Sequence, residues 1–204
     1  EEAQFMYLAM RSAVDDKGKI IGTYLSVRDV TEEQNEMKRE MYNATHDSLT
    51  GLYTAEYLYE MIDQRLTDAN KTSYMIGYFE VSNFKMVNDV FGREFGKQVL
   101  KQMAESLGKN SSSHAIYGRL STDSFGMLMD KSLFNEEKIE QILENFVVKD
   151  ENMEHHIVVH LGICEILPED DIDVALFFDS ARLAASTIKS NYEKQIKHYD
   201  DKLR

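Results

Sequence analysis

Two carboxylates in this sequence stand where a divalent cation could be held. Glu80 comes near the end of a short apolar run, residues 74–81, that is typical of a buried strand, and Asp123 lies in a polar turn, residues 121–124. If the strands on either side of that turn lie next to the first, both carboxylates converge at one edge of a sheet. Mg²⁺ prefers one or two carboxylates together with water and phosphate oxygens. The alternative is two separate solvated charges, which is what most isolated carboxylates are.

The elements that must position these carboxylates alternate between strands and helices. We expect strands over residues 74–81, 114–120, 125–129 and 155–166. Apolar residues recur at helical spacing between Thr54 and Leu66, on both sides of Gly92, after Asn135 and from Val174 to Ile188. The predicted fold is α/β (α+β), with a central mixed, mainly antiparallel sheet of about five strands flanked by helices.

Composition narrows the classes of partner. The chain has 204 residues and a formal net charge of −13. This charge disfavours binding to nucleic acid or to anionic membranes, because proteins bind both through clustered Lys and Arg. A nucleotide held through a metal ion remains compatible with this charge. The single cysteine, Cys164, cannot form an internal disulfide, and no apolar run reaches the roughly 20 residues that span a bilayer. We therefore expect a cytoplasmic chain, with any membrane anchor lying outside these residues.

The N-terminal part is predicted to be separate from the main domain. Residues 1–30 read as a hairpin, and residues 22–33 (GTYLSVRDVTEE) resemble the C-terminal end of a PAS sensor domain. Any strand followed by a capped helix would look similar. Residues 31–46 are predicted to be a charged signalling helix whose narrow apolar stripe suits either a partner helix in a homodimer or a solvated linker.

Three motifs in the main domain resemble the GGDEF family of diguanylate cyclases. Residues 47–52 read DSLTGL, residues 80–92 read EVSNFKMVNDVFG, and residues 119–125 read RLSTDSF, in the order that this family shows. The resemblance covers about residues 45 to 190 and implies the GGDEF fold over residues 47–190. It also implies the family chemistry, in which a dimer joins two GTP molecules into cyclic di-GMP with the help of Mg²⁺.

The signature motif departs from the family pattern at most of its positions. Ser121 and Thr122 replace two glycines that let the nucleotide approach the backbone, Asp123 keeps the first acidic residue, and Ser124 replaces the second before Phe125. Glu80 replaces the metal-binding aspartate of the first strand with a side chain about one methylene longer. The resemblance therefore leaves Glu80 and Asp123 as a metal site whose ligands are displaced, which Mg²⁺ tolerates poorly.

The nucleotide contacts implied by the resemblance are also reduced. Asn88, Lys85 and Phe84 match the block that contacts the nucleotide, but Lys97 replaces the aspartate that pairs with guanine. An ammonium group can only donate hydrogen bonds, whereas the carboxylate it replaces accepts two from the base.

Three further positions of the family pattern are altered. Arg93 replaces the histidine that follows the glycine. The two cations that neutralise the triphosphate fall on Ser186 and Ser190, with Lys189 close by, and the inhibitory Arg-x-x-Asp would need Ser112 and Ala115. Product feedback at that site is therefore predicted to be absent.

These departures favour a domain that no longer makes cyclic di-GMP. It would relay a signal from the PAS-like part to a downstream domain, such as an EAL phosphodiesterase, through residues 191–204, which we expect to be a helix. A variant of this hypothesis keeps GTP as an allosteric ligand. The alternatives are an active or slow diguanylate cyclase and a dimerisation module without nucleotide.

Overall fold

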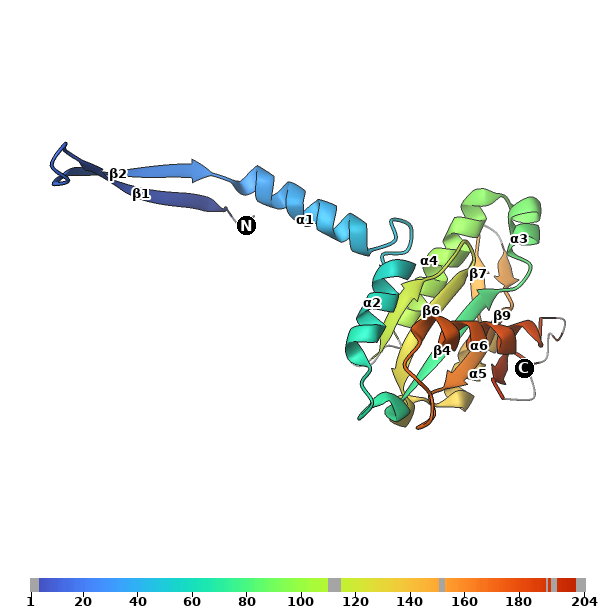
Figure 1. The fold of residues 1–204 in the computed structure, drawn as a ribbon. Helices are drawn as coiled ribbons and strands as arrows, with labels where there is room; N and C mark the ends of the chain where they lie inside the picture. The colour runs from blue at the N-terminus through green and yellow to red at the C-terminus, as the bar shows by residue number, and fades with distance from the viewer. Residues whose placement is uncertain (1–3, 110–114, 151–152, 190, 192–193, 201–204) are drawn as a thin grey trace. The chain divides into compact units, whose positions relative to one another are not determined.

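The chain divides into two units, Glu1–Ala44 and Thr45–Arg204, in the computed structural model. The structure describes residues 4–109, 115–150, 153–189, 191 and 194–200 (Figure 1). No helix within these described residues is both long and apolar enough to cross a bilayer.

The N-terminal unit is a hairpin followed by a helix. Strands β1 (Met6–Val14) and β2 (Ile20–Asp29) pair antiparallel, and α1 (Thr31–Thr45) follows directly. The pairing places Leu8 opposite Val27, so apolar side chains gather on one face of the hairpin. The expected hairpin is confirmed, and its relation to a PAS domain remains a prediction.

The second unit contains the central sheet. After the two-residue β3 (Tyr53–Thr54) its elements are α2 (Ala55–Arg65), β4 (Tyr74–Val81), α3 (Phe84–Phe91), α4 (Arg93–Lys109), β5 (Ile116–Arg119), β6 (Ser124–Asp130), α5 (Glu136–Glu144), β7 (Val147–Lys149), β8 (Glu154–His156), β9 (Val159–Glu165), α6 (Val174–Ser186) and β10 (Ile196–His198). Single turns of 3₁₀ helix cover Lys71–Ser73 and Lys131–Leu133.

The sheet has six strands in the order β10-β9-β4-β6-β5-β3, and β7 and β8 form a separate hairpin. The central strand β4 pairs antiparallel with both β6 and β9, whereas β10 and β3 join the edges in parallel. The predicted mixed, mainly antiparallel sheet is therefore confirmed, with one strand more than the expected five.

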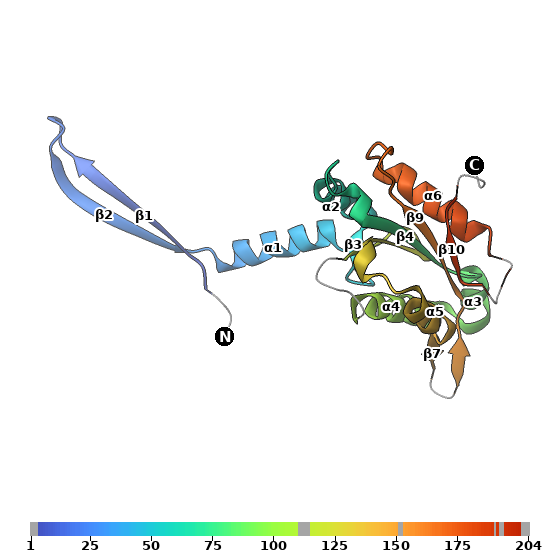
Figure 2. The same cartoon turned by 90° about the horizontal axis from the view of Figure 1, so that it is seen from below.

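Helices cover both faces of this sheet (Figure 2). Because side chains alternate along a strand, Phe79 and Met127 pack toward α4 and α5, while Ile76 and Leu128 pack toward α2 and α6. Glu80 and Ser124 share the α6 face with Ile76, at the end of their strands. The two apolar cores cover the two faces of the sheet, and the polar end of the α6 face is the candidate site.

The close approach of α6 to the sheet depends on Gly162 in β9. A Cβ at this position would lie 1.8 Å from the Ala181 carbonyl oxygen and 2.7 Å from the Ala185 nitrogen. Only glycine lets the helix backbone come this near.

Two local expectations are wrong. Residues 155–166 do not form one strand, because β8 ends at His156 and pairs with β7, and β9 starts at Val159. Residues 191–204 were expected to be helical, but residues 196–198 are strand β10, paired with β9 at Leu161–Ile163. Ile196 is buried there, so pairing and burial at an open sheet edge outweigh the helical spacing.

Candidate functional site

Glu80 and Asp123 do converge at one end of the sheet. Glu80 lies opposite Ser124 in the β4–β6 pairing, and the Val81 backbone N–H donates to the Asp123 carbonyl oxygen at 3.0 Å. On the other side of β4, Glu80 lies opposite the buried His160 of β9. The antiparallel register alone brings these residues together, since the β4 end, the 121–123 turn and the start of β9 meet there.

Lys189, just beyond the end of α6, forms an ion pair with Glu80. Its Nζ lies 2.7 Å from Glu80 Oε1, and the Glu80 side chain is only 16% exposed. The hydrogen bond to Glu80 raises the pKa of Lys189, and the charges of Glu80 and Asp123 act in the same direction, so the ammonium stays charged. Lys189 is thus a cation of the chain itself at the carboxylate that was expected to bind a metal.

The two positions that the family resemblance predicts for phosphate-binding cations carry serines, which supply no charge. Ser186 donates its hydroxyl to the Leu183 carbonyl oxygen of its own helix at 2.7 Å, and Ser190 lies outside the described residues. Ser112 of the altered inhibitory motif also lies outside them. The sequence signal for Lys189 was its spacing near these positions, but its partner could not be identified from sequence.

The signature turn is filled by its own side chains. Ser121 Oγ lies 2.7 Å from Ser124 Oγ and 3.3 Å from Asp123 Oδ1. Burial raises the pKa of the neighbouring Tyr78, and the carboxylates of Glu80 and Asp123 raise it further. The Ser121 side chain therefore occupies space that a glycine would leave open to a ligand.

An ion pair between Arg119 and Asp47, which the sequence did not predict, supports this turn. Arg119 Nη1 lies 3.0 Å from Asp47 Oδ1, and Arg119 also donates to the carbonyl oxygens of Ser121 and Thr122. Burial would raise the pKa of Asp47, but hydrogen bonds from Thr50 and Arg119 outweigh it and hold the pKa below its usual value. The DSLTGL motif thus has a structural role, which is to fix the β5–β6 turn.

The nucleotide block lies at the junction of α3 and α4. Phe84 is buried in the core, Lys85 is exposed, and a Cβ on Gly96 would lie 2.1 Å from Asn88 Oδ1. Lys97, where the family has the guanine-binding aspartate, forms an ion pair with Glu94 at 2.7 Å. The structure therefore keeps Asn88 beside the start of α4 but places a paired cation next to it.

The Glu80 carboxylate is already paired with Lys189 and is not available to a Mg²⁺ ion in this arrangement. Among the described residues, no group of three or more His, Cys, Asp or Glu side chains is placed to hold a metal ion. The Lys189 ammonium already neutralises Glu80, which leaves Asp123 as the remaining acidic donor of the expected pair. A metal would have to displace Lys189 to bind both carboxylates.

Known proteins of cyclic di-GMP metabolism are similar to this chain in sequence. Along the sequence, the chain is 23% identical over 199 residues to PdeB, a cyclic di-GMP phosphodiesterase of Shewanella oneidensis, covering 95% of this chain and 23% of PdeB. It is 28% identical over 167 residues to the diguanylate cyclase DgcP of Escherichia coli, covering 77% of this chain and 49% of DgcP. The chain thus spans half or less of each relative.

Solved structures show the same fold at low identity. The coiled coil and GGDEF domain of DgcB from Caulobacter crescentus, in complex with c-di-GMP, superposes with a TM-score of 0.69 at 18% identity, covering 83% of this chain and 93% of that one. The FimX GGDEF domain from Pseudomonas aeruginosa gives a TM-score of 0.64 at 14% identity, covering 75% and 98%.

The family model described as "Diguanylate cyclase, GGDEF domain" matches residues 44–195, which include every strand of the central sheet except β10. This chain therefore belongs to the diguanylate cyclase GGDEF-domain family.

Proposed function

We propose that residues 47–190 form a regulatory GGDEF domain that does not synthesise cyclic di-GMP. The observation that carries this proposal is the ion pair between Lys189 and Glu80, with 2.7 Å between Nζ and Oε1. The pair holds a positive charge at the carboxylate that would bind a metal ion in the family chemistry. The side chains of Ser121 and Thr122 and the Lys97–Glu94 pair support the same proposal.

The regulated activity would belong to another part of a longer protein. PdeB and PdeR, the latter from Escherichia coli, are both named cyclic di-GMP phosphodiesterases, and this chain spans only 23% and 21% of their lengths. We propose that this GGDEF domain transmits a signal from an N-terminal sensor of PAS type, through α1, to a neighbouring domain such as an EAL phosphodiesterase. A homodimer formed through α1 would suit such a relay, because Met37 and Met41 are exposed on that helix.

A second candidate function is allosteric binding of GTP without turnover. It is favoured by Asn88, whose amide oxygen remains against Gly96 at the start of α4, where a guanine edge could be contacted. Lys97 weighs against it, because its ammonium group is paired with Glu94 and cannot accept a hydrogen bond from the base.

One assay separates these functions. The purified chain is mixed with GTP and either Mg²⁺ or Mn²⁺, cyclic di-GMP is measured by chromatography, and GTP binding is measured by calorimetry. DgcP of Escherichia coli serves as the active control, and Asp123→Ala supplies the background. We expect no product above that background. Product that scales with protein and disappears in Asp123→Ala would overturn the proposal, whereas binding without product would establish the allosteric variant.

A further inference from the structure

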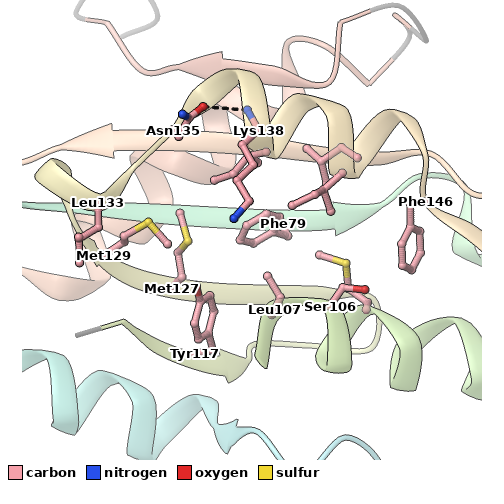
Figure 3. A pocket seen from close by; sticks show the side chains of 14 residues that line it. Phe79, Ser106, Leu107, Tyr117, Met127, Met129, Leu133, Asn135, Lys138 and Phe146 are labelled. Carbon is pink, nitrogen blue, oxygen red and sulfur yellow. Dashed lines mark hydrogen bonds between the residues drawn. The ribbon is translucent and has the colours of Figure 1, made fainter. Parts of the chain in front are cut away.

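A pocket on the opposite face of the sheet has no part in the site described above. It lies between α4, α5 and the strands β4, β5 and β6, and it encloses about 90 Å³ (Figure 3). Its walls are mainly apolar, with Phe79, Met127 and Met129 from the sheet and Met103 and Leu107 from α4.

Water is a poor occupant of this pocket. A buried water needs two to four polar partners, and the polar side chains here are few. The Asn135 carboxamide oxygen already accepts from the Lys138 backbone N–H at 2.9 Å, and the Ser106 side chain lies at the far end in Figure 3. A space of this kind is filled more favourably by an apolar group.

Two donors remain at the pocket. Figure 3 shows the Lys138 side chain extending from α5 toward Phe79, and within the described part of the chain Lys138 has no ion-pair partner. The Tyr117 hydroxyl has no hydrogen-bond partner among the described residues, and burial raises the pKa of Tyr117 to about 12, which keeps its proton in place. Lys138 is also the only basic residue of α5, whose sequence is EEKIEQILE.

Lys138 and Tyr117 can both donate hydrogen bonds, so they favour a ligand whose polar group accepts hydrogen bonds. The apolar walls favour a ligand whose remaining part is a hydrocarbon. We propose that this pocket binds a small carboxylate with an apolar body of about the size of one ring or a few methylene groups, its carboxylate held by Lys138 and Tyr117. Charge-assisted hydrogen bonds to a carboxylate are about twice as strong as neutral ones. The inference is independent of the proposed function, because the pocket and Glu80 lie on opposite faces of the sheet.

The probe is 3-phenylpropanoate, compared with 3-phenylpropanol and 3-phenylpropylamine, which keep the ring and change the head group. Binding is followed by NMR of the protein labelled at its methionine methyl groups, because Met103, Met127 and Met129 line the pocket. Met37 and Met153, which are exposed elsewhere, act as internal references. We expect the carboxylate to shift the three pocket methyls and to bind more tightly than the alcohol, with the amine weakest.

Variants test the two donors and the pocket itself. Lys138→Met should weaken 3-phenylpropanoate binding by at least about tenfold, the low end for a charge-assisted hydrogen bond, and leave the alcohol within about twofold. Lys101→Met, at an exposed lysine of α4 that does not line the pocket, is the matched control. Tyr117→Phe should weaken the carboxylate less, and Ile142→Trp should fill the pocket and remove all three shifts.

The proposal is overturned if no probe shifts the pocket methyls, or if the amine binds as tightly as the carboxylate. It is also overturned if Lys138→Met binds like the wild-type chain. Lys138 is exposed and outside both apolar cores, so this variant stays informative even if Ile142→Trp fails to fold, which circular dichroism would reveal.

Discussion

Lys189 Nζ lies 2.7 Å from Glu80 Oε1, although 109 residues separate the two along the chain. This pair connects the segment just after α6 to the end of the central strand β4, beside the GGDEF signature turn. A metal ion and Lys189 would compete for the same carboxylate, so the charge at residue 189 decides how the site responds to divalent cations.

The first prediction concerns metal affinity. Lys189→Met removes the competing ammonium group and keeps the aliphatic stem, so we expect Mn²⁺ to bind about tenfold more tightly, which corresponds to about 1.4 kcal/mol. The measurement is Mn²⁺ titration followed by electron paramagnetic resonance. Lys101→Met changes the net charge equally but lies on α4, and it should leave the affinity within about twofold. Equal affinities in wild type and Lys189→Met would contradict the competition.

The second prediction concerns the ion pair below the signature turn. The Asp47 and Arg119 side chains are 23% and 15% exposed, so Arg119→Met leaves a largely buried carboxylate without its partner. We expect the free energy of unfolding to fall by about 2 to 3 kcal/mol, because breaking one side of a buried pair is strongly destabilising. Urea denaturation provides the measurement.

The matched control for that variant is Arg182→Met. Arg182 pairs with Asp179, and both side chains are more than 60% exposed at 62% and 64%. Exposed pairs contribute about 0 to 1 kcal/mol, so this variant should be nearly neutral. If both variants cost the same, the Asp47–Arg119 pair would have no special structural role.

The third prediction concerns acid stability. Burial opposes ionisation of Asp47, but the hydrogen bonds from Thr50 and Arg119 prevail and keep the pKa below its usual value of 3.8. A lowered pKa means that the folded state favours the carboxylate, so its contribution is complete well above pH 3.8 and is lost as the pH falls through the folded pKa. Urea unfolding between about pH 6 and pH 3 should therefore show a steeper loss of stability in the wild-type chain than in Asp47→Asn. Parallel curves would show that Asp47 does not contribute to acid sensitivity.

The fourth prediction concerns the contact between α6 and β9. Gly162→Ala would place a methyl group 1.8 Å from the Ala181 carbonyl oxygen, and helix backbone cannot move aside as a flexible side chain can. We expect a loss of about 3 kcal/mol or more in the free energy of unfolding, at the upper end for overpacking. Gly22→Ala, where an added Cβ meets nothing within 4 Å, is the control and should be close to neutral. A small decrease in the free energy of unfolding of Gly162→Ala would mean that α6 does not pack closely on β9.

The sequence by itself determined the order of the main helices and strands and the turn between β5 and β6 that carries Asp123. Apolar alternation and turn residues are local signals, and two strands joined by a short turn must pair next to each other, so β5 and β6 followed directly from residues 116–130. The convergence of Glu80 and Asp123 also required β4 to lie beside β6. The sequence did not establish this pairing, and the structure shows it. The family motifs could also be recognised from the sequence, because each is a short continuous run of residues.

Only the tertiary structure decided which distant cations pair with Glu80 and Asp47. The Glu80–Lys189 and Asp47–Arg119 pairs join residues 109 and 72 positions apart, and no local pattern encodes which distant side chain will fill a given space. The strand at Ile196–His198 shows the same limit, since its helical spacing yielded to backbone pairing with β9 once the sheet offered an open edge. Contacts of this kind depend on how closely α6 packs on the sheet, which a single glycine at residue 162 permits.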